Sequence, residues 1–179
     1  GMRLRTFITG VFGTLRIIPS LAILLLCIPI LGTGLAPALV ALSFLAIPPV
    51  LINTTQAFAG IPAPIVETAR GMGMSDARIF LTVKAPLSAP LVLTGIKTAV
   101  VEVIASATLA AYIGAGGLGN IIFTGLGLLR ADLLLIGGVS VAVLSMLADS
   151  LLSLLERRVV RYRNPDPKKR RGGIGAAAV

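Results

Sequence analysis

The 179-residue sequence contains no histidine, no tryptophan and a single cysteine, Cys27. Without histidine, neither a histidine-based catalytic triad nor a histidine metal site can form. One cysteine cannot form an internal disulfide, and its position inside an apolar run makes it a small packing residue. The Walker A pattern and paired carboxylates in a polar pocket are also missing, so the chain offers no recognisable route to hydrolysis. We expect no catalytic residues, no metal and no cofactor.

Charged residues are scarce as well. They make up 13% of the sequence, whereas soluble domains carry about 25%. Hydrophobic residues make up 56%, and a soluble helical bundle of this composition would expose large apolar patches and aggregate. The composition therefore predicts an all-α, polytopic membrane helical bundle that forms one domain.

About four segments are candidates to cross a bilayer, whose core needs about 20 helical residues. We place them at 17–31, 35–59, 86–111 and 132–155. The first is short unless residues 11–16 contribute to it. Pro48 and Pro49 predict a break inside the second, which only neighbouring protein or a water-filled cavity could satisfy. The glycine-rich segment 112–130 predicts a short re-entrant or interfacial helix with glycine hinges.

The positive charge is unevenly placed. The net charge is +9, and eight of the sixteen Lys and Arg residues follow Glu156, which indicates membrane topology rather than nucleic-acid binding. We divide the chain into a transmembrane domain, 1–160, and a basic tail, 161–179, that we expect to be disordered and cytoplasmic. Counting crossings back from the tail places the polar segment 64–86 and the arginine-bearing N-terminal end inside. The pattern of basic residues inside holds at each loop.

Lys97 and Glu102 lie well inside the third predicted span, where charged side chains are costly and usually face a bundle interior or a cavity. They are five residues apart, so we do not expect them to stack on one helix face. Either each pairs with polar groups of a neighbouring helix, or both border a transport route. Asn53 leaves a similar choice between interfacial capping and lining a pathway. With Tyr112, these residues are candidates for a translocation path.

The segment 67–86 is the longest stretch that can leave the membrane. It predicts a helix, a hinge between Gly71 and Gly73, a second short helix begun by Ser75 and Asp76, and a stop at Pro86. A polar helical hairpin between membrane spans can dock in a groove of a soluble, energy-supplying protein and move with it as a rigid element.

The spacing within this segment resembles the EAA signature of the permease subunits of bacterial ABC importers. The usual form is Glu-Ala-Ala, three residues, Gly, nine residues and Ile-x-Leu-Pro. This chain has ETA, three residues, Gly73, nine residues and VKAP, from Glu67 to Pro86. Three positions carry mild substitutions, and the spacing is intact.

Further segments are similar to the osmoprotectant (glycine betaine, carnitine and choline) permeases: IPSLA at 18–22, ARGMGM at 69–74, GIKTA at 95–99 and IGAGGLG at 113–119. The resemblance covers about residues 16–160. It implies the type I ABC importer fold and a transport subunit, not an enzyme, in the cell membrane. It also implies a pair of permeases (a homodimer or a heterodimer), two cytoplasmic ATPases that hydrolyse ATP, and an external substrate-binding protein.

In that family the EAA hairpin forms the coupling helix that docks on the ATPase. Carried over, the helix spans about 75–81, with Asp76, Ala77 and Phe80 facing the ATPase, while Glu67 and Gly73 shape the hairpin. The coupling positions implied by the resemblance are Glu67, Ala69, Gly73, Ser75, Asp76, Ala77, Phe80 and Pro86. The family core usually has five spans, so either an N-terminal span is missing here or residues 1–16 belong to an abbreviated start.

The osmoprotectant substrate follows from the resemblance alone, because no aromatic cage for a quaternary ammonium ion can be read from a sequence with 4% aromatic residues. One alternative is an importer permease for another small solute, such as methionine. A self-contained channel or carrier would use Lys97 and Glu102 directly, and the intact EAA spacing argues against it. A scaffold without transport gains nothing from charges inside the membrane.

Overall fold

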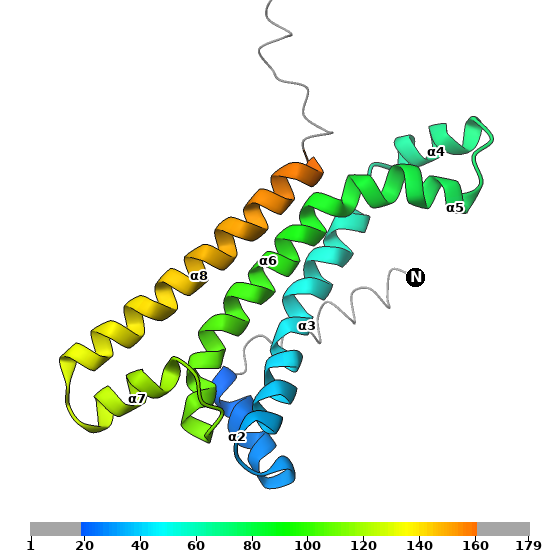
Figure 1. Ribbon diagram of the computed structural model, residues 1–179. Coiled ribbons are helices and arrows are strands. Elements are labelled where there is room, and N and C mark those ends of the chain that lie inside the picture. The colour runs from blue at the N-terminus through cyan, green and yellow to red at the C-terminus, as the bar shows by residue number, and fades with distance from the viewer. Residues whose placement is uncertain (1–18, 161–179) are drawn as a thin grey trace, which may run out of the picture.

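The computed structural model describes residues 19–160, and every regular element in this range is helical (Figure 1). This confirms the predicted all-α fold class. The elements, in order, are α2 (Ser20–Leu31), α3 (Leu35–Ala59), α4 (Ala63–Gly71), α5 (Asp76–Ile79), the π-turn η1 (Phe80–Lys84), α6 (Ala85–Ala110), the 3₁₀ turn η2 (Ala111–Ile113), α7 (Gly119–Gly127) and α8 (Ala131–Val160).

Three helical stretches in the described range are long and apolar enough to cross a membrane: Leu35–Ala59, Asp76–Ile113 and Ala131–Arg158. They correspond to the second, third and fourth predicted spans. For the first predicted span the structure shows α2, a shorter apolar helix. The start of that span, residues 1–16 and the basic tail 161–179 lie outside the described residues.

Helix α3 is continuous, so the predicted break at Pro48 and Pro49 is wrong. Both prolines are buried, and helix interiors in membranes tolerate proline where neighbouring protein packs around it. Here the neighbour is Gly95 of α6. A Cβ atom on Gly95 would lie 2.6 Å from the Asn53 Cβ and 3.0 Å from the Pro49 carbonyl oxygen. The backbone of α6 at Gly95 therefore packs directly against α3 near Pro49 and Asn53.

The predicted stop at Pro86 is also wrong. Helix α5, η1 and α6 form one continuous helical stretch, Asp76–Ile113. Within η1 the ladder shifts register, and the Ala85 N–H donates to the Phe80 carbonyl, five residues back. Proline cannot donate to the regular ladder, and a single π-turn is a known way for a helix to absorb such a disturbance.

The best-buried core cluster joins α2, α3, α6 and η2. Its members are mostly small: Leu24, Ala38, Ala41, Ala110 and Ile113. Small residues let membrane helices approach closely and gain van der Waals contact. The Gly34 N–H also donates to the Ile113 carbonyl (2.8 Å), which ties the α2–α3 turn to η2.

The glycine-rich segment contains the short helix α7, as predicted. It follows a turn in which Gly114, Gly116 and Gly117 have positive φ angles, and it packs beside the first part of α8 (Figure 1). Glycines on both helices make this contact close. A Cβ on Gly137 would lie 2.6 Å from Ile122 Cγ1, and one on Gly125 would lie 2.9 Å from Leu133 Cβ.

Candidate functional site

The hairpin at one end of the bundle contains α4 and α5 (Figure 1). Its bend is a Schellman motif built on Gly73, whose φ is +76°. The Met74 N–H donates to the Ala69 carbonyl (3.2 Å), and the Gly73 N–H donates to the Arg70 carbonyl (2.9 Å). These bonds satisfy carbonyls at the end of α4. The predicted hinge therefore lies at Gly73, where a left-handed backbone favours glycine.

The second arm starts at Ser75, as predicted. Its Oγ accepts a hydrogen bond from the Arg78 N–H (3.4 Å), which caps α5, and Asp76 occupies the first turn. Across the bend, Arg70 and Asp76 form an ion pair at 3.1 Å. Both side chains are exposed, so the pair contributes little, about 0–1 kcal/mol. The shape of the hairpin comes mainly from its backbone geometry.

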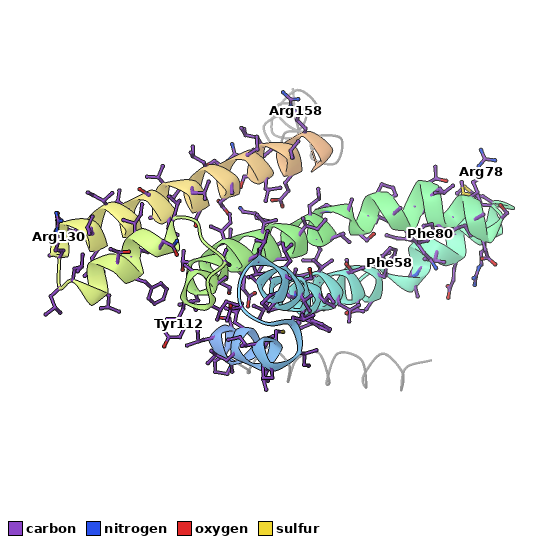
Figure 2. The ribbon with its side chains drawn as sticks, turned by 60° about the horizontal axis from the view of Figure 1, so that its bottom comes forward. Phe58, Arg78, Phe80, Tyr112, Arg130 and Arg158 are labelled. Atoms are coloured by element: carbon purple, nitrogen blue, oxygen red, sulfur yellow. The ribbon has the colours of Figure 1, made fainter. Side chains whose placement is uncertain are left out.

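The base of the hairpin is joined to α3 by two aromatic rings. Phe80 stacks on Phe58 with ring centroids 5.8 Å apart and an interplanar angle of 7°, and Figure 2 shows the two residues side by side. The sequence does not point to this contact, because a phenylalanine such as Phe58 near the end of an apolar span carries no local signal. The base of the hairpin is therefore packed against the end of α3.

The proposed coupling positions fall into two groups. Ala69 is buried within the hairpin, so it shapes the fold. The exposed positions are Glu67, Gly73, Ser75, Asp76, Ala77, Phe80 and Pro86. Two exposed apolar side chains that sequence reasoning did not single out, Met72 and Leu81, belong to the same hairpin. The hairpin thus presents apolar side chains beside charged ones, an arrangement suited to contact with another protein.

A second site lies inside the membrane segment, between α6 and α8. The Lys97 Nζ lies 3.1 Å from Asp149 Oδ1 and donates a hydrogen bond to Ser153 Oγ at 2.7 Å. The structure therefore shows Lys97 paired with polar groups of a neighbouring helix, and its place beside a transport route stays a prediction. Asp149 and Ser153 were not predicted, although an Asp well inside the fourth predicted span was an available signal.

Glu102 lies on the same cleft as Lys97. The cleft has a volume of about 530 Å³ and is lined by Thr94, Lys97, Thr98, Val101, Glu102, Ala105 and Asp149. The two charged residues do not stack on one helix face, yet their long side chains reach a common space. The Glu102 Oε2 atom is buried and has no hydrogen-bond partner among the described residues. At one end of the cleft, the Thr94 hydroxyl lies 3.4 Å from Glu156 Oε1.

The other two candidates for the path lie elsewhere. Asn53 is half-buried at the contact with Gly95, and its amide donates to the Pro49 carbonyl of its own helix (2.8 Å). Tyr112 is 64% exposed and lies near Phe123, with ring centroids 5.5 Å apart. The structure therefore gathers two of the four predicted path residues, Lys97 and Glu102, in one cleft.

Comparison with known proteins gives one matching family, described as the binding-protein-dependent transport system inner membrane component. It matches residues 1–161. The chain belongs to this family. Members are permease subunits of ABC importers, so the chain is a multi-pass membrane transport subunit and not an enzyme. Such permeases work with a separate ATPase and a substrate-binding protein.

Two relatives of this inner membrane component are similar over most of the chain. The carnitine transport permease protein OpuCB of Listeria monocytogenes is 43% identical over 157 residues, which are 88% of this chain and 72% of that protein. The choline transport system permease protein OpuBB of Bacillus subtilis is 40% identical over 152 residues, 85% of this chain and 70% of that protein.

The fold is also similar to a solved importer. An inward-facing structure of the MetNI methionine ABC transporter aligns with a TM-score of 0.74 at 24% identity, over 88% of this chain and 76% of that chain. At this level of identity the likeness concerns the fold alone. It confirms the predicted type I importer permease fold.

Proposed function

We propose that this permease subunit forms the translocation path for a small osmoprotectant of the glycine betaine, choline or carnitine class. The observation that carries the proposal is the 40–43% identity to permeases named for carnitine and choline transport, which extends over 85–88% of the chain. The methionine alternative has less support, because the likeness to the methionine transporter is one of fold at 24% identity.

We further propose that the hairpin and the C-terminal end of α8 lie in the cytoplasm. Arg70, Arg78 and Lys84 belong to the hairpin segment, and Arg157 and Arg158 lie at the end of α8. Figure 1 places the hairpin and the end of α8 toward one end of the molecule, and α7 at the other. Basic residues gathered at one end of a membrane bundle favour the cytoplasmic side.

In this orientation the exposed face of the hairpin docks on a cytoplasmic ATPase. Asp76, Ala77 and Phe80 make the contact, while Gly73 and Ala69 fix the bend. A second permease subunit, the same chain or a related one, completes the membrane pathway. Lys97 and Glu102 border that pathway at the cleft between α6 and α8.

Reconstitution tests the proposed function. The chain is assembled in proteoliposomes with the ATPase and binding protein from its own genome, and uptake of labelled choline, glycine betaine, carnitine and methionine is measured. We expect ATP-dependent uptake of at least one quaternary ammonium solute and none of methionine. ATP-dependent methionine uptake alone would contradict the substrate class, and uptake by the chain without an ATPase would contradict the importer.

A further inference from the structure

The cleft between α6 and α8 has more negative than positive groups. Lys97 is already engaged, because its ammonium group pairs with Asp149 (3.1 Å) and donates to Ser153 (2.7 Å). Glu102 lines the same cleft, and its buried Oε2 atom has no hydrogen-bond partner in the described part of the chain. One lysine therefore shares this cleft with two carboxylates, and a third, Glu156, lies beside Thr94.

A carboxylate at this position would be stabilised by a nearby cation. A charge without a partner inside a membrane protein is costly, so such groups usually pair or mark a substrate route. Among the residues that line the cleft, Lys97 is the one with a positive charge, and its bonds go to α8. Glu102 thus lacks a cation within the described chain, and a ligand is a natural source of one.

The lining fits an organic cation better than a metal ion. A hard metal ion takes about six or more oxygen ligands, often from several carboxylates, whereas Asp149 already pairs with Lys97 and leaves Glu102 as the remaining carboxylate of the lining. The hydroxyls of Thr94 and Thr98 donate to carbonyls of their own helix, at Pro90 (3.0 Å) and Thr94 (2.9 Å). No group of three acidic or cysteine residues suited to a metal is found among the described residues.

A quaternary ammonium ion matches these properties. It has no N–H group to satisfy, so it needs a negative neighbour and space. The cleft volume of about 530 Å³ falls within the range of small-molecule sites, about 300–1,000 Å³. The lining residues include no aromatic side chain, so the attraction here is Coulombic rather than cation–π.

We propose that Glu102 attracts the quaternary ammonium group of the transported solute as it passes between α6 and α8. This inference rests on the proposed function and adds a residue that selects for positive charge inside the membrane domain. Selection would then occur twice, once at the external binding protein and once at Glu102.

The test uses the complete importer in proteoliposomes, with choline as the probe. We compare wild type, Glu102→Gln, Glu102→Asp and Asp132→Asn. Asp132 is a matched control, since it is a carboxylate at the start of α8 that pairs with Arg130, away from the cleft. Basal ATPase activity, co-purification of the subunits and the affinity of the binding protein for choline are measured in parallel.

We expect Glu102→Gln to lower kcat/KM for choline uptake about thirtyfold or more, the range for loss of one member of a desolvated charge pair. Glu102→Asp keeps the charge and should retain most of the uptake, and Asp132→Asn should behave as wild type. Co-purification of the subunits and choline binding by the separate binding protein should not change in Glu102→Gln.

Three results would overturn the inference. One is wild-type uptake by Glu102→Gln. Another is a loss that Glu102→Asp does not rescue, or that comes with loss of co-purification, since either assigns Glu102 to packing against another subunit. The third is a wild-type complex that takes up no quaternary ammonium solute, which removes the proposed function together with this inference. The wild-type and variant results therefore separate the two failures.

Discussion

The hairpin and the α6–α8 cleft are built in opposite ways. The hairpin is fixed by neighbours in sequence: the bend at Gly73 and the cap at Ser75 involve residues at most five apart. The cleft is fixed by residues far apart, since Ser153, which accepts from Lys97, lies 56 positions away. Local backbone geometry therefore determines the hairpin, and packing between distant residues determines the membrane cleft.

Packing between helices that are distant in sequence should be more sensitive to added side-chain volume than the hairpin is. We expect Gly95→Val to destabilise the α3–α6 contact by about 3 kcal/mol, because the added carbons would enter the space of Asn53 and the Pro49 carbonyl, and overpacking costs about 1–3 kcal/mol or more. The measurement is the yield of monodisperse protein and its thermal unfolding. Gly138→Val is the control, since a Cβ on Gly138 meets nothing within 4 Å. Equal loss in both variants would contradict the account.

Breaking the ion pair should have the next largest effect. Removing one member of a fully buried pair costs about 3–5 kcal/mol. Here the side chains are 28% and 45% exposed, so we expect about 2 kcal/mol for Lys97→Met. The double variant Lys97→Met/Asp149→Leu should regain much of that stability, because neither charge remains. Thermal unfolding of the purified complex measures both. Additive losses would show that the pair does not link α6 to α8.

Within the hairpin, Gly73→Ala should cost about 1–2 kcal/mol locally, because a left-handed backbone is unfavourable for a residue with a Cβ. The +76° φ of Gly73 is the reason. We expect the global unfolding temperature to change little and ATP-dependent uptake to fall severalfold. Gly71→Ala is the matched control, since Gly71 is in α4 and open space surrounds its Cβ position. A similar uptake in both variants would argue against a role for the bend.

The smallest effect concerns the connection between the two regions. Phe58→Ala removes the ring on which Phe80 stacks, and such aromatic pairs are worth about 0.5–1.5 kcal/mol beyond their buried area. We expect ATPase activity to persist while solute transported per ATP declines. Phe44→Ala is the control, because Phe44 is an exposed phenylalanine of the same helix. If Phe44→Ala uncouples transport equally, the stack has no special part in it.

The contrast between the regions also explains what the sequence could predict. The side chain of Ser75 and the backbone freedom of Gly73 favour a cap and a bend through local chemistry, so these two features of the hairpin were predictable from the sequence. The partners Asp149 and Phe58 were not, because nothing in their neighbourhood says which distant residue they meet. The break predicted at Pro49 and the stop predicted at Pro86 were both wrong. Whether a membrane helix tolerates proline depends on tertiary contacts in the first case and on a π-turn in the second.

The central claim is that the hairpin couples the permease to a cytoplasmic ATPase. Cys27 is the single cysteine, so Cys27→Ser provides a cysteine-free background for site-directed cross-linking. Ala77→Cys would place a thiol on the exposed face of the hairpin, and Arg130→Cys would place one at the opposite end of the molecule. In Figure 2 the labels Arg78 and Arg130 mark these two ends. We predict that the assembled complex forms a cross-link to the ATPase from Ala77→Cys and none from Arg130→Cys. A cross-link from Arg130→Cys, or none from Ala77→Cys in an active complex, would contradict the claim.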